Sequence, residues 1–467
     1  MVTKTRPIPI GVRRRGWRAP AWLGAHLRSR QQMVPLPAPA TRIPALLWFG
    51  AVLFFFGIYT NIGVKFAEVS TIPMVSALPG LALLLCYPGL VSPRMVRFVV
   101  VPMLFVLAFS VLAPQFGRLL FKRVAGVGQT GFSALIGYVV AWTLARFGRV
   151  RLHKFLAIAI PVFLILIVVE LALPPMRALM IAYHDLYGLD LDLDVLADRE
   201  NTMGGYRPKL FTSETSYVAT SAMLLLIGYV WTGAGVRRYV FAAGYMVVAV
   251  ALIRSPIVAL ALPPIFAAVY TDPSLGRNRG LYAFWVTIIT VMVVSAVALL
   301  GFEVIANRLS SALSGQDYST TYRTYGALVV AFNVLKAHPL FGAGAGTLLP
   351  VKDIVISTYL DLGVPLDAAE TSWLYSINNA FASVLIYFGL VGTTVLLVFL
   401  WRLFKSDVNR PVLPVLLAFL CYNMTYGGIY TPTYFATVAA IFTVAKLRVI
   451  TPPRPTASRR PPFRISA

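Results

Sequence analysis

Long apolar runs alternate with short polar segments over most of this chain. A helix needs roughly 20 apolar residues to cross the hydrocarbon core of a bilayer, and many of the runs come close to that length. The pattern therefore predicts an all-α polytopic membrane protein with about 12 transmembrane helices. The predicted spans are residues 43–63, 71–90, 98–114, 124–145, 155–173, 215–232, 239–253, 256–270, 281–301, 380–401, 411–427 and 432–447.

Composition agrees with this class and changes how the net charge is interpreted. The 467 residues are 58% hydrophobic and 12% charged, whereas a soluble domain carries about 25% charged residues. In a soluble protein, a net charge of +24 would suggest nucleic acid as a partner. Here the basic residues follow the predicted topology, so we expect membrane lipids around the chain and no nucleic acid.

The basic residues also predict an orientation. With the N-terminus inside, the segments expected in the cytoplasm hold 28 of the 41 Lys and Arg residues but only two of the 17 acids, Asp272 and Asp407. Such an excess of positive charge is typical of cytoplasmic loops. We therefore expect both termini in the cytoplasm, with a basic, disordered tail at 1–42, a transmembrane domain at 43–447 and a second basic tail at 448–467.

Two of the predicted extracytoplasmic loops are long, at 174–214 and 302–379. The first contains the run L-D-L-D-L-D-V-L-A-D-R-E at 189–200. Its acids lack the glycine turn and ligand spacing of an EF-hand, so we expect a solvated, partly amphipathic segment, with a divalent-cation site as the alternative. Cys86 and Cys421 offer no disulfide framework or metal cluster, and we expect no metal and no cofactor.

The second loop contains an apolar run at 322–337, with Arg323 near its start and Lys336 near its end. The run is short for a span. Counting it as a span would reverse the membrane orientation of every span that follows. The basic C-terminal segments would then lie outside, against the charge asymmetry. We therefore expect a helix that lies at the outer membrane interface.

Arg254 stands between the predicted spans 239–253 and 256–270. A proline disfavours helical backbone at the residue before it, so Pro256 predicts two helices in a hairpin with Arg254 at its tip. An arginine at the bilayer centre costs on the order of 3 kcal/mol. A bound anion would offset that cost, and an arginine that reaches to lipid headgroups is the alternative.

Arg323, flanked by Tyr322 and Tyr325, is a second candidate anion ligand. A guanidinium makes planar, bidentate contacts with phosphate oxygens, and a helix N-terminus adds N–H donors and a favourable dipole. An interfacial anchor is the alternative. Past this helix, His338 precedes alternating glycines that would let backbone approach a ligand closely, although no G-K-[ST] of a P-loop follows. These glycines are Gly342, Gly344 and Gly346.

The run F-T-S-E-T-S-Y at 211–217 lies at the outer end of span 215–232. Glu214 and Tyr217 are three positions apart and would share one side of a helix. Glu214 is either a carboxylate that stabilises the helix start or one placed beside the hydroxyls of an incoming sugar.

In their order along the chain, these pieces resemble the O-antigen ligase/polymerase superfamily of bacterial envelope glycoconjugate enzymes. The resemblance covers roughly residues 210–400. It rests on Arg254-Ser255, on Arg323, on the turn H-P-L-F-G-A-G at 338–344, on Asn378-Asn379 followed by Gly389 and Gly392, and on S-E-T-S-Y at 213–217, which is similar to the S-E-P-S-Y of many exopolysaccharide polymerases.

The resemblance implies an inverting, metal-independent glycosyltransferase of the bacterial inner membrane. Its donor and acceptor would be undecaprenyl-diphosphate-linked glycans, and a flippase and a chain-length regulator would be possible protein partners. Arg254, Arg323 and Glu214 would be catalytic, with the arginines neutralising the departing diphosphate. Substrate would be bound by Tyr217, Tyr325, His338, Gly342, Gly344, Gly346 and Asn379.

Two alternatives to a polymerase remain open. A ligase would transfer finished glycan to a different acceptor, but ligases of this family often carry His-Asn where this chain has Asn378-Asn379. A flippase for lipid-linked sugars would be expected to carry charge along its central spans. The interiors of the predicted spans are nearly free of charge, and the polar groups collect at the outer face, which favours an enzyme.

Overall fold

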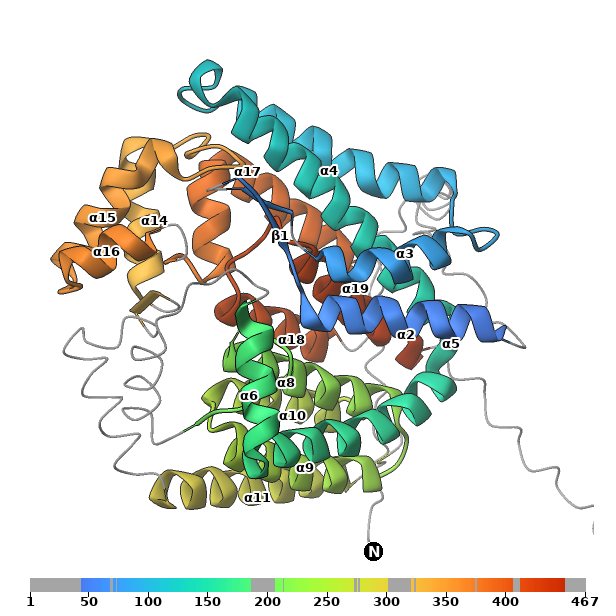
Figure 1. The fold of residues 1–467 in the computed structure, drawn as a ribbon. Coiled ribbons are helices and arrows are strands. Elements are labelled where there is room, and N and C mark those ends of the chain that lie inside the picture. Colours follow the sequence, from blue (N-terminus) through green and yellow to red (C-terminus); the bar gives the residue numbers. More distant parts are fainter. Residues whose placement is uncertain are drawn as a thin grey trace, which may run out of the picture. The chain divides into compact units, whose positions relative to one another are not determined.

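We describe the fold from a computed structural model (Figure 1). The structure describes residues 43–67, 70–72, 74–185, 206–212, 214–272, 275, 278–300, 321–322, 325–373, 376–405 and 412–449. Arg323 and the acidic run 189–200 therefore lie outside the described residues. So do the predicted tails, except for the last two residues of the final helix, 448 and 449.

Helices make up nearly all of the described secondary structure. Their bounds are α2 (Ala45–Thr60), η1 (Val75–Ala77), α3 (Leu78–Leu85), α4 (Pro93–Val111), η2 (Gly117–Leu119), α5 (Leu120–Ala172), α6 (Pro174–Asp185), α8 (Thr215–Thr232), α9 (Arg237–Ile253), η3 (Pro256–Ala261), α10 (Leu262–Tyr270), α11 (Arg279–Leu300), α14 (Tyr325–Ala337), η5 (Leu349–Val351), α15 (Lys352–Asp361), α16 (Leu366–Ser372), α17 (Ala380–Lys405), α18 (Val412–Thr425) and α19 (Pro432–Val449). The strands β1 (Val64–Ala67) and β2 (Ser70–Ile72) pair antiparallel.

The prediction of a helical membrane protein is confirmed at this level. Over the described residues, four helices are long and apolar enough to cross a membrane, and several shorter apolar helices accompany them. Large apolar side chains are exposed along α4 and the second half of α17, among them Val101, Leu104 and Leu397, as expected of surfaces that face lipid. The count of twelve spans stays a prediction.

The helix α5 contains two of the predicted spans, 124–145 and 155–173. Gly148 interrupts it with φ 71° and ψ 167°, a left-handed backbone that suits glycine. The chain turns there. In the first half, Gly131 lies against Met103 of α4 and Gly137 against Phe435 of α19, whereas Leu156 of the second half lies against Gly228 of α8.

Two predicted spans differ from the structure. In place of a span at 71–90, α3 has only 8 residues, about 12 Å of helix, and the chain before it forms β2 and the short helix η1. At the predicted span 380–401, α17 is long and apolar enough to cross a membrane, but it is kinked, because Gly389 interrupts it with φ 58° and ψ −163°. The local hydrophobic pattern carries no signal for this break.

The described helices bury two main apolar cores. The larger involves α2, α3, α5, α8, α9, α10, α18 and α19. The smaller joins α14, α15 and α16 to the first part of α17, so the late loop has a core of its own. The expected helix within 322–337 is present as α14, which buries Ala327, Val330 and Val334 while Leu328 and Phe332 are exposed.

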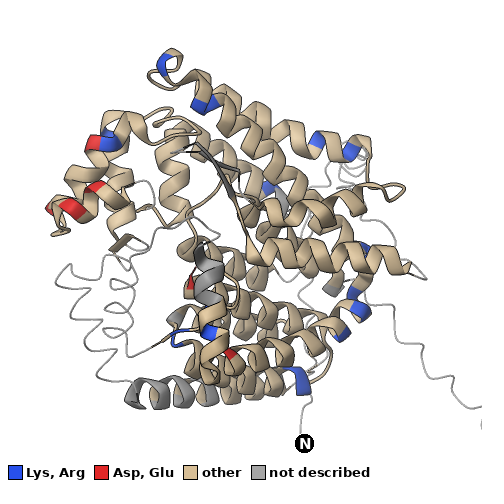
Figure 2. Ribbon diagram, viewed as in Figure 1, with Lys and Arg blue, Asp and Glu red and all other residues tan. Residues whose placement is uncertain are grey.

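Charge is distributed unevenly over these elements (Figure 2). Acids gather on α15 and α16 of the late loop, as Asp353, Asp361, Asp367 and Glu370. At the C-terminal end of α8, the carbonyl oxygen of Gly233 accepts from Arg149 Nη2 at 2.6 Å and also from Arg238, and the buried Arg238 forms an ion pair with Asp272. Cations at this end of a helix are favoured by its dipole.

Candidate functional site

The start of α8 and the end of α9 bring Glu214 and Arg254 to the same end of a helix pair. The two helices have 18 and 17 residues and are joined by a short turn. Short connections make neighbouring helices antiparallel, and helices of equal length then end at the same level. Two candidates forty positions apart thus share one end of the bundle.

Glu214 occupies the N-cap position of α8, but its carboxylate does not cap the helix. The side chain is exposed, and its Oε2 accepts a hydrogen bond from Ser216 Oγ at 2.7 Å. Glu214 thus makes no capping hydrogen bond, but a carboxylate at the N-cap position still favours the helix start through the helix dipole. An exposed carboxylate at this position has the access that a group acting on a hydroxyl would need.

Arg254 ends α9 in a left-handed conformation, with φ 53° and ψ 42°. Its side chain is exposed, while Ser255 is buried. The break predicted before Pro256 is confirmed, because α9 ends at Ile253 and η3 begins at Pro256. Left-handed backbone costs a non-glycine residue roughly 1–2 kcal/mol, so the arginine is held here at the expense of local strain.

Tyr217 belongs to a cluster of tyrosines that the sequence analysis did not single out. Its ring lies 6.2 Å from that of Tyr426, edge to face. Tyr422, Tyr426 and Tyr434 stack on one another at 5.6–6.5 Å, and the Tyr434 hydroxyl donates to Asn423 Oδ1 at 2.8 Å. The signal was available, since Tyr422, Tyr426, Tyr430 and Tyr434 recur at every fourth position.

Asn379 caps α17. Its Oδ1 accepts from the backbone N–H groups of Phe381 at 3.0 Å and Ala382 at 3.2 Å, and the residue is 3% exposed. One turn later, Ser383 Oγ donates to the carbonyl oxygen of Gly427 at 2.8 Å. The start of α17 is thereby held against residues 426–431, which we call the α18–α19 loop.

Tyr322 links this region to the late loop. Its carbonyl oxygen accepts from the backbone N–H of Asn378 at 3.2 Å, directly before the Asn379 cap. Its hydroxyl hydrogen-bonds with Ser372 Oγ at 2.7 Å. Arg323 itself lies outside the described residues, but the residue before it is attached to the start of α17. Tyr325, at the start of α14, is 45% exposed.

The predicted glycine-rich segment forms a tight turn, residues 339–346, which we call the glycine turn. His338 precedes it and ends α14, donating its backbone N–H to Val334 O at 2.7 Å. The turn is bound to the break in α17 by four backbone hydrogen bonds. They join Ala343 N to Ile386 O (2.7 Å), Gly344 N to Tyr387 O (3.1 Å), Leu390 N to Pro339 O (3.0 Å) and Val391 N to Leu340 O (3.1 Å).

At each of these glycines, a side chain would collide with a different neighbouring residue. A Cβ on Gly342 would collide with the carbonyl oxygen of Ile386, one on Gly344 with the guanidinium of Arg123, and one on Gly346 would lie 2.6 Å from the carbonyl oxygen of Lys122. All three have φ between 66° and 88°. The close backbone approach that the glycines predicted is therefore made to α5 and α17.

Arg123 is a buried arginine that the sequence analysis missed. It is 1% exposed, lies near the start of α5 and donates to three backbone carbonyls. Glu170, near the end of α5, is a buried acid that the sequence analysis also missed. It accepts from Tyr206 Oη at 2.6 Å and from the backbone N–H groups of Lys209 and Leu210. Both lie at or within predicted spans, so the helix interiors are less free of charge than the apolar pattern suggested.

The structure thus gathers Tyr217, Asn379 and the glycine turn around the α18–α19 loop. Tyr430 of that loop packs against Tyr387 at 4.8 Å, next to the glycine turn, and its carbonyl oxygen accepts from Ser133 Oγ at 2.6 Å. This cluster offers rings, hydroxyls and amides. The charged groups described next to it are Arg123, which donates to carbonyl oxygens of the glycine turn, and Glu214, three positions before Tyr217.

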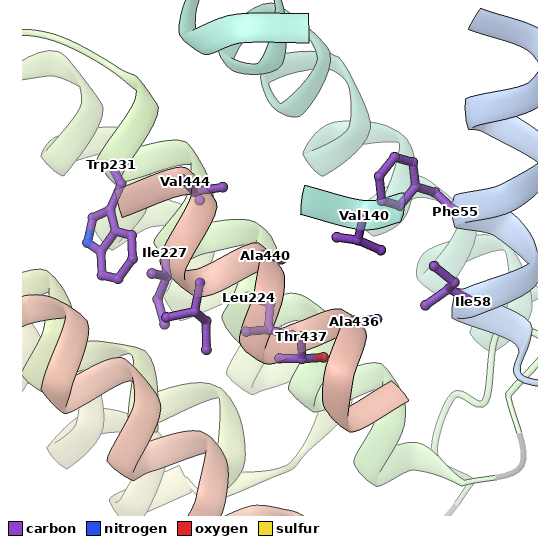
Figure 3. Close-up of a pocket in the computed structure, with 12 residues that line it drawn as sticks. Phe55, Ile58, Val140, Leu224, Ile227, Trp231, Ala436, Thr437, Ala440 and Val444 are labelled. Atoms are coloured by element: carbon purple, nitrogen blue, oxygen red, sulfur yellow. The ribbon is translucent and has the colours of Figure 1, made fainter. Parts of the chain in front are cut away.

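An apolar cavity of about 150 Å³ lies between α2, α5, α8 and α19 (Figure 3). Phe55, Val140, Leu224 and Ala440 line it, together with Thr437 and Trp231, whose indole N–H is buried without a hydrogen-bond partner. Such a cavity suits hydrocarbon. It offers no group that could take part in a reaction.

No three His, Cys, Asp or Glu side chains gather to hold a metal ion anywhere in the part of the chain that the structure describes. Asp190, Asp192 and Asp194, the alternative cation ligands, lie outside that part. Comparison with known proteins adds no assignment, because no family model matches this sequence and no curated protein does so either.

Proposed function

We propose that this protein polymerises lipid-diphosphate-linked oligosaccharide repeat units at the outer face of the bacterial inner membrane. The observation that carries the proposal is the gathering of Tyr217, Asn379 and the glycine turn, from distant parts of the sequence, around one loop of an apolar helical protein. These are residues of the motifs by which the chain resembles the O-antigen ligase/polymerase superfamily.

In this proposal the membrane domain has twelve spans with both termini in the cytoplasm. The late loop 302–379 is periplasmic and covers the site. Donor and acceptor are both glycans on undecaprenyl diphosphate, the second being extended by the first. A flippase would supply the repeat units and a chain-length regulator would act on the product.

The reaction moves a glycan from one oxygen to another. The acceptor hydroxyl oxygen forms a bond to the anomeric carbon of the donor, and the bond from that carbon to the diphosphate oxygen breaks, with its electron pair leaving on the diphosphate. Attack opposite to the leaving group inverts the anomeric carbon. Glu214 orients the hydroxyl and accepts its proton.

The arginines act on the charge that develops on the leaving group. Arg254 and Arg323 hold the departing diphosphate, whose negative charge grows in the transition state. Tyr217 and Tyr426 pack against sugar rings, and Tyr325 and His338 lie on the late-loop side of the same substrate. The diphosphate is already a good leaving group, and we expect turnover to persist in excess chelator.

The lipid-linked glycans of a strain lacking this protein test the proposal. Single repeat units should accumulate on the lipid diphosphate at the outer face. Long chains that remain unattached to any acceptor would indicate a ligase instead. Repeat units trapped at the cytoplasmic face would indicate a flippase, and either result would overturn the polymerase assignment.

A further inference from the structure

Glu170 is a buried acid that holds the segment leading to Glu214. It lies near the C-terminal end of α5 and is fully buried. Its Oε1 accepts from Tyr206 Oη at 2.6 Å and from the backbone N–H of Lys209 at 2.8 Å, and its Oε2 accepts from the backbone N–H of Leu210 at 2.9 Å. Both carboxylate oxygens are used and all three partners are donors, so the group is bound here as an anion.

A buried carboxylate at this position is costly unless it has a specific use. A charged group inside an apolar helix bundle loses its hydration, and acids within membrane spans are rare and commonly functional. An apolar side chain would serve at least as well if the packing of α5 were all that was needed. What the anion of Glu170 does is bind two successive backbone N–H groups of a turn some forty positions later.

The turn bound by Glu170 has an unfavourable backbone. Leu210 and Phe211 are left-handed, with φ of 40° and 63°. Thr212 then closes the turn, because its backbone N–H donates to Lys209 O at 2.8 Å and its hydroxyl donates to the same oxygen at 2.6 Å. Left-handed backbone is disfavoured in residues that carry a side chain, so the two bonds to the carboxylate help to keep the segment in this form.

Thr212 also connects the turn to the start of α8. Its hydroxyl lies 3.0 Å from the backbone oxygen of Glu214, and that oxygen accepts from the backbone N–H of Tyr217 at 3.0 Å. A path of hydrogen bonds and backbone thus runs from Glu170 through the turn to Glu214 and Tyr217. It ends at the two residues of the run S-E-T-S-Y to which the proposed function gives a role.

We propose that Glu170 is a positioning residue for the transfer reaction and sets the place of the Glu214 carboxylate at the start of α8. The inference rests on the proposed function, in which Glu214 orients the acceptor hydroxyl and takes its proton. Glu170 itself acts only through the turn at 209–212. A misplacement of about 1 Å at a reacting group costs about a hundredfold in rate, so loss of this anchor should lower turnover rather than donor binding.

Hydrogen exchange measures the positioning without any transfer of glycan. Purified full-length protein in detergent is compared as wild type and Glu170→Gln by mass spectrometry over residues 206–217. The amide keeps the shape of the side chain but turns a donor toward one of the three bound donors. Exchange over 206–217 should rise about tenfold, as expected for one lost hydrogen bond to a charged group.

Asp272→Asn is the matched control, since Asp272 is the other buried acid among the described residues. It forms its ion pair with Arg238 of α9 and directly follows α10. Its replacement should raise exchange in α9 and α10 and leave 206–217 as in the wild type.

The kinetic test determines whether Glu170 acts through Glu214. Lipid-linked repeat units extracted from a strain that lacks this protein are donor and acceptor, and rates are taken per folded protein. Glu170→Gln should lower kcat about a hundredfold and change KM less than about threefold. Glu214→Gln should lower kcat at least about a hundredfold. Adding Glu170→Gln to it should cost less than about threefold more, because residues that act through one group are not additive.

Thr212→Val keeps the test decisive where Glu170→Gln fails to fold. Valine has the shape of threonine without the hydroxyl that connects Lys209 O to Glu214 O. The variant should raise exchange over 206–217 and lower kcat about tenfold. Like Glu170→Gln, it should have little further effect when Glu214→Gln is already present.

Unchanged exchange over 206–217 in Glu170→Gln, or in Thr212→Val where the first variant does not fold, would overturn the inference whatever the activity. Losses in kcat that multiply in the double variant would overturn it too, since Glu170 would then serve only the stability of the fold. If the wild type joins no repeat units while exchange still rises as expected, the proposed function fails and Glu170 remains the anchor of the segment that carries Glu214.

Discussion

Gly342 and Gly389 lie directly against each other: a Cβ added to Gly389 would be 2.6 Å from the backbone nitrogen of Gly342. Gly342 belongs to the late loop and Gly389 to the break in α17. Their contact attaches the loop that carries the proposed site to a helix of the membrane domain.

Replacing Gly389 with alanine should destabilise the protein strongly. Its φ of 58° with ψ of −163° is a region used almost only by glycine, and strain there costs about 1–3 kcal/mol before any clash is counted. Gly128→Ala is the control, since a Cβ at Gly128 of α5 meets nothing within 4 Å. Thermal unfolding in detergent, followed by circular dichroism, should show a large loss for the first variant and none for the second.

The buried ion pair of Arg238 and Asp272 should be sensitive to the loss of one partner. Asp272→Asn leaves the buried Arg238 without its anion, which typically costs about 3–5 kcal/mol. Asp353→Asn, at an exposed acid of α15, should have little effect on the unfolding temperature. If the double variant Arg238→Met with Asp272→Leu is no more stable than Asp272→Asn, the loss does not come from an unpaired charge.

Tyr359 should make the late loop sensitive to alkaline pH. Burial raises the pKa of Tyr359, whose hydroxyl donates to Ser376 O at 2.9 Å. A group whose pKa is higher in the folded state stabilises the fold below its unfolded pKa, here about 10, and that contribution is lost as the pH rises above this value.

The measurement is the unfolding temperature between neutral pH and pH values above about 10. Tyr359→Phe should be less stable at neutral pH by about 1 kcal/mol, with a smaller further loss in alkali than the wild type. Tyr325→Phe is the control, because Tyr325 is exposed at the start of α14. If the unfolding temperatures of the wild type and Tyr359→Phe fall equally in alkali, the prediction is contradicted.

Arg254 allows strain and chemistry to be separated. Arg254→Gly relieves the left-handed backbone and should keep or raise the unfolding temperature, while polymerisation falls roughly a hundredfold, as for the loss of one donor to a developing negative charge.

Arg254→Lys and Arg323→Lys should each lose most activity, and the double variant should be little worse than the worse single. Wild-type polymer length in Arg323→Lys cells with normal protein levels would remove the paired-arginine site.

Orientation is tested by reporter fusions. A reporter placed after Gly235, in the turn between α8 and α9, should be cytoplasmic, as should one after Asn409. Reporters at Asp198 and at Asp353 of α15 should be periplasmic. A cytoplasmic signal at Asp353 would overturn the assignment of α14 as an interfacial helix and with it the periplasmic late loop.

The features that could be predicted from the sequence are those set by short-range patterns. The length and apolarity of the runs were sufficient for a helical membrane protein, and Pro256 was sufficient to place the break after Arg254. Glycines at alternate positions indicated a close backbone approach, which is made to α5 and α17 and not to a ligand. In each case the physical cause lies within a few residues of the feature that it produces.

The features that required the tertiary structure depend on partners far away in the chain. Gly389 by itself only weakens a helix; the break in α17 is fixed by hydrogen bonds to the glycine turn, some fifty positions earlier in the chain. Arg123 looks like an ordinary arginine at the end of a span, yet its acceptor on Ala343 is 220 positions away. Hydrophobic periodicity reports which face of a helix avoids water, whereas the pairing of buried polar groups is decided only when distant segments pack together, since each group must find its partner inside the fold.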